Sequence, residues 1–85
     1  MLMKKHIWEQ IKGIPCDEII RALKKDGYDE TGKRGAEMGF RHNVTKNYVV
    51  IHYHPDKTYG PNLLKALIKD IGWTPKDMKR LKLIK

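Results

Sequence analysis

The spacing of hydrophobic residues changes twice along this chain, and this change of period restricts the fold more than any other feature. The apolar positions follow helical spacing from residue 15 to 26, and again from 61 to 71. The residues between these segments favour strands instead. The helical apolar positions are Ile19, Ile20, Ala22 and Leu23 in the first segment, and Leu64, Leu67, Ile68 and Ile71 in the second. The pattern predicts a helix, a block of strands and a second helix.

Residues at the ends of both helical segments fit helix boundaries. Pro15 suits the first turn of one helix and Pro61 that of the other, because a first-turn N–H has no helical partner to lose. Gly27 and Gly72 follow the last apolar positions, as expected of left-handed residues that end helices. We therefore expect each helix to stop at its glycine.

Three short segments between the helices have the composition of strands. They are residues 28–35 (YDETGKRG), 39–43 (GFRHN) and 47–55 (NYVVIHYHP). The third is the strongest, because it is the richest in β-branched and aromatic residues. Residues 43–47 (NVTKN) are typical of a turn. This order predicts a three-stranded antiparallel sheet.

A third, short helix is expected near the C-terminus, over the segment TPKDMKRLKLI. Thr74 and Asp77 have the spacing of a capping box, and Pro75 fits the first helical position. Met78 and Leu81 would form the buried side of this helix. The helix is an addition to the helix, strand and helix order described above.

The whole chain is predicted to be one α+β domain, a two-layer sandwich with its helices on one face of the sheet. Residues 1–13 form a lead-in that ends at Gly13 and lays Trp8 on the domain. Residues 14–72 form the core, and residues 73–85 form a C-terminal helical extension. A chain of 85 residues has room for only one compact core.

The charge of the chain is strongly basic, with 18 Lys and Arg residues against 10 acidic ones and a net charge of +8. Two interpretations are open: a polyanionic partner, or a solvated surface that keeps the protein soluble. Cys16 is the only cysteine, so an internal disulfide is excluded and a reducing, cytoplasmic location is expected. No apolar run approaches the ~20 residues that span a bilayer, so we expect no membrane association.

Basic side chains gather in the sequence around a predicted turn at Gly35, where they could hold a phosphate backbone by charge and shape. Each belongs to a loop, a strand end or a helix start. They are Lys33, Arg34, Arg41, Lys57 and Lys65. As a group, they are the best candidates for binding.

The histidines of the strand block add to this set. His52 and His54 are two residues apart on the third predicted strand, so both project from the same face as Tyr48 and Val50. Phosphate contact or a plain exposed edge is favoured over a metal site, because only Asp56 could join the pair as a ligand. We therefore predict no metal and no cofactor.

His42 shares its strand face with Phe40, which is a predicted core residue. Two interpretations stay open for this histidine: a ring satisfied by hydrogen bonds at the margin of the sheet, or a catalytic ring.

Three segments resemble the HicA toxins of HicAB toxin-antitoxin systems, which are small RNA-cleaving proteins. They are IIRALKKDGY (residues 19–28), RGAEMGFRHN (34–43) and VIHYHPDKTYGPNLLKALIKDIGW (50–73). The resemblance implies a double-stranded-RNA-binding-domain-like fold, metal-independent cleavage of mRNA and a HicB-type antitoxin partner. The residues predicted to bind RNA are Lys33, Arg34, Gly35, Arg41, His42, His52, His54, Lys57 and Lys65.

The resemblance assigns the catalytic position to Glu37, because Gly35, Ala36 and Glu37 stand where the family has Gly, Ser and its catalytic His. Three interpretations are open for Glu37: a replacement general base, an exposed turn residue in a protein that binds RNA without cutting it, or a substitution introduced to silence a toxic protein. The alternative functions are therefore a non-catalytic RNA-binding module and a protein-interaction domain with the same fold.

Overall fold

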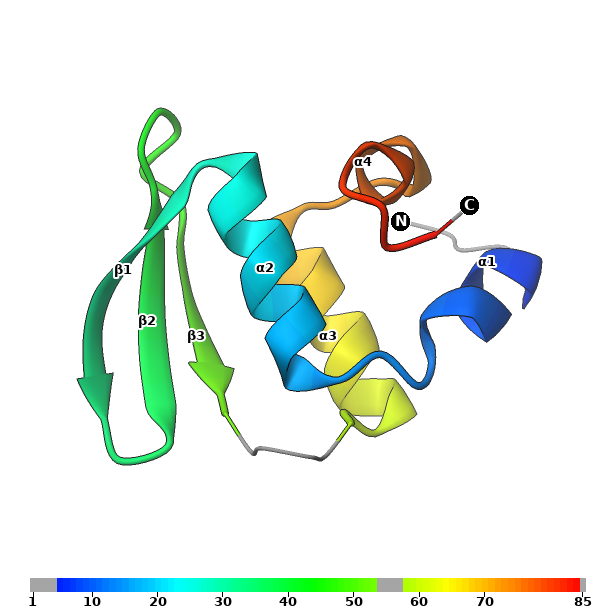
Figure 1. Cartoon of the computed structure of the whole chain (residues 1–85), viewed down its shortest axis with the longest axis horizontal. Coiled ribbons are helices and arrows are strands. Elements are labelled where there is room, and N and C mark those ends of the chain that lie inside the picture. The colour runs from blue at the N-terminus through cyan, green and yellow to red at the C-terminus, as the bar shows by residue number, and fades with distance from the viewer. Residues whose placement is uncertain (1–4, 54–57, 85) are drawn as a thin grey trace.

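The computed structural model describes residues 5–53 and 58–84 and has the predicted α+β order (Figure 1). Helices and strands follow one another as helix, helix, three strands, helix and helix. They are α1 (Lys5–Ile11), α2 (Cys16–Asp26), β1 (Tyr28–Arg34), β2 (Glu37–His42), β3 (Tyr48–His52), α3 (Pro61–Ile71) and α4 (Pro75–Arg80). No helix in the described part of the chain is long and apolar enough to cross a membrane.

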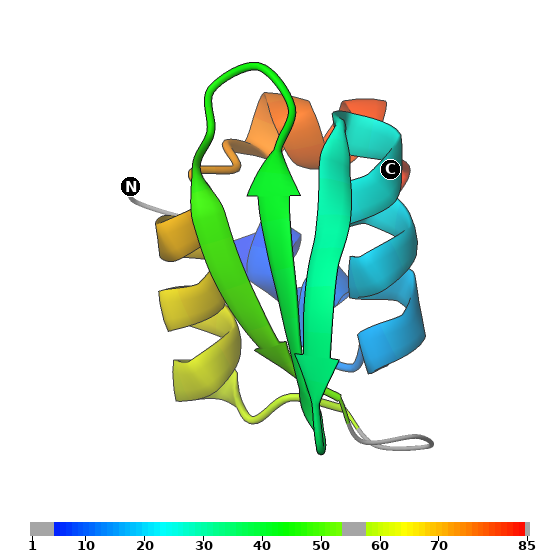
Figure 2. The ribbon, with the colours of Figure 1, turned by 90° about the vertical axis from the view of Figure 1, so that its left-hand side faces the viewer.

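The three strands form one antiparallel sheet in the order β1-β2-β3. Helices α2 and α3 pack against one face of this sheet, and α1 and α4 lie on the same side, beyond them (Figure 1). Figure 2 views the sheet from its opposite face, which no described segment covers. We call this uncovered side the outer face. Because this face is exposed, its side chains are accessible to a binding partner.

The core lies between the sheet and its two covering helices. Phe40 and Ile51 are fully buried on the inner face of the sheet, at 0% exposure. Both predicted helical stripes contribute to the same core, because alternate sheet residues and every third or fourth helix residue face each other. Its helical members are Ile19, Ala22, Leu23, Leu64, Leu67, Ile68 and Ile71. The predicted stripes are therefore confirmed, except that Ile20 is only partly buried.

Both α2 and α3 end at the predicted glycines, whereas the start of α2 differs from the prediction. Gly27 and Gly72 end their helices with φ of 105° and 88°, in the left-handed region that favours glycine. Pro15 precedes the first turn of α2 instead of belonging to it, because its ψ of 159° is that of extended backbone. Helix α4 has the predicted capping box between Thr74 and Asp77.

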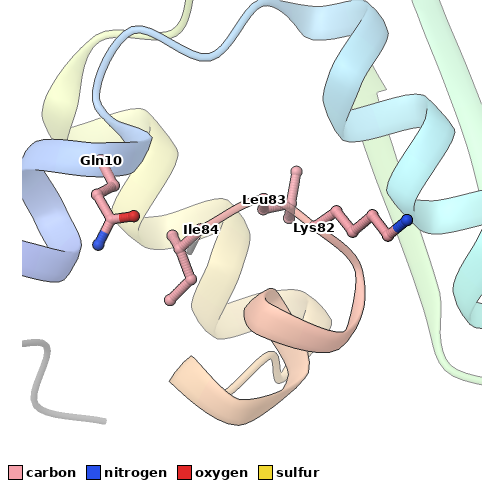
Figure 3. A pocket seen from close by; sticks show the side chains of 4 residues that line it. All are labelled: Gln10, Lys82, Leu83 and Ile84. Carbon is pink, nitrogen blue, oxygen red and sulfur yellow. The ribbon is translucent and has the colours of Figure 1, made fainter.

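Helix α4 is shorter than predicted, because the chain turns back after Arg80. Lys82 has a φ of 61°, and the N–H groups of Leu83 and Ile84 both reach the carbonyl oxygen of Met78. This turn buries Leu83 and Ile84 against the domain. The lead-in contains the regular helix α1. A depression lined by Gln10 of α1 and by residues 82–84 lies between these two end segments (Figure 3).

The hairpin between β1 and β2 is tighter than the sequence suggested. Arg34 pairs directly with Glu37, so the turn contains only Gly35 and Ala36. Gly35 has a φ of 59° and takes the first central position, where a type II′ hairpin turn requires glycine. Strand β2 consequently begins at Glu37, and not at Gly39 as predicted. Glu37 is thus an exposed strand residue and not a turn residue.

Candidate nucleic-acid interface

Three ionisable side chains form a row across the outer face at the hairpin end of the sheet. Arg34 of β1 pairs with Glu37 of β2, and Glu37 pairs in turn with His52 of β3. Directly paired residues of antiparallel strands project to the same face, with Cβ atoms about 5 Å apart. All three side chains are exposed. We call these residues the cross-strand row.

The cross-strand row has no internal partners within the described residues. None of its three side chains makes a hydrogen bond or an ion pair with any residue in 5–53 or 58–84. A cation, a carboxylate and an imidazole are therefore held side by side by strand register alone. Such groups are available to a ligand that brings the complementary hydrogen bonds.

The backbone of His52 is fixed from the opposite side of β3. Its carbonyl oxygen accepts a hydrogen bond from the Tyr59 hydroxyl at 3.3 Å and a weaker one from Cys16 Sγ at 3.8 Å. Burial raises the pKa of Tyr59, and its hydrogen bond with Cys16 adds to the effect, so the hydroxyl stays a neutral donor. Cys16 is itself buried. These contacts hold His52 in place beside Glu37.

A groove runs over the outer face next to the row. Its floor contains Gly32 and Gly39, which pair directly across β1 and β2 and contribute no side chains. Tyr48 and Val50 of β3 line the groove as well. The complete lining is Thr31, Gly32, Lys33, Arg34, Glu37, Gly39, Tyr48 and Val50. Arg34 and Glu37 therefore belong both to the groove and to the cross-strand row.

Tyr48 lies across this floor rather than pointing straight into solvent. A Cβ atom added at Gly39 would collide with the Tyr48 hydroxyl oxygen and would lie 2.8 Å from Thr31 Oγ1. The guanidinium carbon of Arg41 lies 5.4 Å from the centroid of the Tyr48 ring, within the range of a cation–π contact. Arg41 is not part of the groove lining. Tyr48 thus stands between the groove and Arg41.

His42 lies at the other end of β2 and has hydrogen bonds on both ring nitrogens. Nδ1 accepts from the N–H groups of Val44 and Thr45 at 3.1 and 3.2 Å. Nε2 lies 2.8 Å from the carbonyl oxygen of Asp26, so the neutral ring carries its proton on Nε2. Of the two open interpretations, this geometry favours the satisfied histidine at the sheet margin. The structure does not bring His42 together with the cross-strand row.

The remaining predicted binding residues are dispersed. Lys65 lies on α3 with its ammonium 4.8 Å from the centroid of the Trp8 ring, so it faces α1 and not the turn at Gly35. Lys33 pairs with the buried Met38, so its side chain leaves β1 on the helical side of the sheet although it borders the groove. His54 and Lys57 lie outside the described residues.

Sequence reasoning missed the groove, although one signal for it was present. Glycine inside a strand often marks a place where another group approaches closely, and Gly39 is such a position. The residue that approaches it, Tyr48, was recognised only as a member of the exposed strand face. Thr31 and Gly32 carried no signal, because their position depends on the bulge between Glu30 and Gly32.

The chemistry of the cross-strand row suits transfer of a phosphoryl group. A carboxylate can accept a proton, an imidazole can donate one, and an arginine can hold a phosphate through paired N–H groups. Within residues 5–53 and 58–84, no group of three His, Cys, Asp or Glu side chains could hold a metal ion.

Comparison with known proteins finds one family whose model covers most of the described sheet and helices. The family described as HicA toxin of bacterial toxin-antitoxin matches residues 16–73, from the first residue of α2 to the tryptophan after α3. This range includes all three strands, the groove and the cross-strand row. No curated protein and no solved structure matches the chain significantly.

Proposed function

This chain belongs to the HicA family, the toxins of bacterial toxin-antitoxin systems, and we propose that it binds mRNA on the outer face of its sheet and cleaves it there. Family membership implies an RNA substrate and an antitoxin partner in general. The finer proposal is that of an mRNA interferase that acts in the cytoplasm and is covered by a HicB-type antitoxin.

The observation that carries the proposal is the cross-strand row. Cleavage of RNA by its own 2′-hydroxyl needs a base for that hydroxyl, an acid for the 5′-oxygen that leaves, and positive charge on the phosphate. Glu37, His52 and Arg34 supply these three groups in adjacent positions. Adjacent strands are about 4.8 Å apart, so base and acid can reach opposite sides of one phosphate.

In the proposed reaction, the Glu37 carboxylate takes the proton of the 2′-hydroxyl, and the 2′-oxygen attacks the adjacent phosphorus. The bond from phosphorus to the 5′-oxygen breaks, and protonated His52 gives its proton to that oxygen. Arg34 balances the negative charge of the phosphate as the bonds change. The products are a 2′,3′-cyclic phosphate and a free 5′-hydroxyl.

The replacement of the family's histidine by Glu37 is compatible with this reaction because His52 is its direct strand partner. In this arrangement the Glu37 carboxylate serves as the base, and the neighbouring imidazole serves as the acid. The site thus contains one acid and one base in spite of the substitution.

The test is incubation of the purified protein with a long unstructured RNA in the presence of a chelator. Glu37→Ala and Glu37→His are the matched variants. Cleavage by the unaltered chain that disappears in Glu37→Ala would support Glu37 as the base. Cleavage only by Glu37→His would contradict that role and would mean a nuclease fold that lacks its catalytic residue. Salt-dependent binding without cleavage in all three would identify a non-catalytic RNA-binding module.

A further inference from the structure

The groove beside the cross-strand row has Tyr48 along one side and the paired Gly32 and Gly39 in its floor, and the cleavage reaction alone requires none of these residues. We propose that it binds one unpaired nucleobase, stacked on the ring of Tyr48, and that the substrate is therefore single-stranded RNA. This inference rests on the proposed function, because it assumes that the RNA backbone lies on the outer face. It adds a base-binding residue and a substrate class to that function.

The first observation is the state of the Tyr48 ring. The residue is 49% exposed, yet its hydroxyl end lies over Gly39 and Thr31, so the ring is laid across the sheet. The groove lining contains Tyr48 but not Arg41, which makes the cation–π contact with the same ring. A ring held in this way offers an open surface to a second planar group. Base stacking on aromatic side chains uses this kind of surface.

The second observation is the pair of glycines below the ring. Gly32 and Gly39 are directly paired, and neither has a positive φ, so their backbone conformation does not require glycine. At Gly39 the requirement is space, because a Cβ would displace the Tyr48 hydroxyl. At Gly32 a Cβ would meet nothing within 4 Å, so the floor beside the ring is open. The strand pair therefore leaves room for a flat group next to Tyr48.

The third observation is the distribution of charge around the groove. Arg34 and Arg41 both occupy outer-face positions. Glu37, the β2 partner of Arg34, is four residues from Arg41 on the same strand, or about 13 Å. Arg34, which belongs to the cross-strand row, borders the groove at its hairpin end, and Arg41 lies beyond Tyr48. A strand whose base enters the groove would have phosphates close to both cations. Charge complementarity thus favours an anionic strand over a neutral peptide as occupant.

These observations discriminate between single-stranded and duplex RNA. In an A-form duplex the bases are paired and stacked on one another, so no base can lie flat on Tyr48. An unpaired base can leave its own stack and occupy the groove. The outer face is therefore suited to loops and unstructured segments of mRNA.

The test measures binding separately from cleavage. The probes are a 2′-O-methyl RNA strand of about eight nucleotides, which cannot be cut by its 2′-hydroxyl, an abasic strand of the same length, and a duplex of the same sequence. The variants are Tyr48→Ala and Tyr48→Phe, with Val44→Ala as a control that truncates an exposed apolar residue elsewhere. Circular dichroism establishes that each variant is folded.

We expect Tyr48→Ala to weaken binding of the single strand by about 5- to 150-fold, the loss typical of one stacked base. Tyr48→Phe keeps the ring and should bind within about twofold of the unaltered protein, as should Val44→Ala. The abasic strand should bind the unaltered protein and Tyr48→Ala equally. Equal binding of the single strand by these two proteins, or tighter binding of the duplex, would overturn the inference.

The same experiment separates this inference from the proposed function. Tyr48-dependent binding in a protein that does not cut the unmodified RNA would support the base site and contradict the cleavage proposal. Cleavage that depends on Glu37, with binding that does not depend on Tyr48, would do the reverse. Gly39→Ala gives a further check, because its Cβ displaces the Tyr48 ring without removing it. It should weaken binding of the single strand more than of the abasic strand.

Discussion

Two groups of polar side chains lie at opposite ends of this small domain, and they differ in whether their members have partners within the protein. The cross-strand row, Arg34, Glu37 and His52, has no side-chain partner within residues 5–53 and 58–84. The second group, formed by Asp26, Trp73, Asp77 and Arg80, is fully connected. We call it the C-terminal cluster. One group is therefore available to a ligand, whereas the other holds the chain together.

The C-terminal cluster joins the extension after α3 to the end of α2. The indole Nε1 of Trp73 donates to Asp26 Oδ2 at 3.0 Å, and Arg80 donates to Asp26 Oδ1 at 2.6 Å. Arg80 also pairs with Asp77 at 3.5 Å, and Asp77 belongs to the capping box of α4. The comparison teaches that formal charge alone does not identify a site in a basic protein. The absence of internal partners is the more informative property.

The largest expected effect concerns the catalysis that we propose for the cross-strand row. Glu37→Gln and His52→Ala should each lower the rate of RNA cleavage by about 10²- to 10⁴-fold, the usual contribution of one acid or base. Because neither side chain has a partner within the described residues, the free energy of unfolding should change by no more than about 0.5 kcal/mol. Single-turnover cleavage and urea denaturation of the same samples measure both. A large loss of stability in either variant would break the comparison.

The opposite behaviour is expected of Trp73. Its side chain is 2% exposed and bonded to Asp26, so Trp73→Ala should cost about 3–5 kcal/mol of stability. At a temperature where the variant is still folded, its rate of RNA cleavage per folded molecule should equal that of the unaltered protein. Urea denaturation, monitored by circular dichroism, gives the free energy of unfolding. A specific loss of RNA binding in the folded variant would argue that the C-terminal cluster takes part in the site.

A smaller effect separates the two described histidines of the sheet. His42→Ala removes a hydrogen bond to the Asp26 carbonyl and the acceptor of two backbone N–H groups, so it should destabilise the protein by about 1–3 kcal/mol. RNA binding should be unchanged, whereas His52→Ala should leave stability unchanged and reduce cleavage. Thermal unfolding gives the stability of both variants, and titration with RNA gives their affinity for it. Weaker RNA binding by His42→Ala, in a variant that is still folded, would instead place His42 among the residues that bind RNA.

The smallest effect is the pH dependence that Asp77 contributes. A hydrogen bond from the backbone N–H of Thr74 lowers the pKa of Asp77, and contacts with the Thr74 hydroxyl and Arg80 act in the same direction. A carboxyl group with a lowered folded pKa stabilises the protein above its unfolded pKa of about 3.9, and this contribution is lost as pH falls through the folded pKa. Asp77→Asn should therefore flatten the stability profile below about pH 4, with a difference on the order of 1 kcal/mol at neutral pH. An unchanged profile, measured by urea denaturation between acid and neutral pH, would contradict the paired state of this carboxylate.

The fold was largely predictable from the sequence because local signals and the global pattern agree. The glycines after both helical stripes, the capping box at Thr74 and the alternation in residues 48–52 each act over a few residues, so they can be recognised without a structure. The start of β2 was misjudged because a two-residue turn depends on the pairing of Arg34 with Glu37, which composition does not reveal. Register is a property of two strands together.

The candidate site was predicted only in part for the same reason. Arg34 and His52 were recognised as binding candidates and Glu37 as the catalytic position, but their alignment in one row follows from the register of three strands. Lys65 was assigned to the turn at Gly35, yet the packing of α3 directs it to Trp8. The position of the Tyr48 hydroxyl over Gly39 could not be predicted from the sequence, because the contact joins residues on different strands.

The most direct test of the central claim is an NMR titration of the protein with the uncleavable 2′-O-methyl strand. The amide and side-chain signals of Arg34, Glu37, Tyr48 and His52 report on the outer face, and the indole N–H of Trp73 reports on the C-terminal cluster. We predict that RNA shifts the first set in a salt-dependent manner and leaves the Trp73 signal in place. Shifts confined to Trp73 and its neighbours, with an unchanged outer face, would contradict the account.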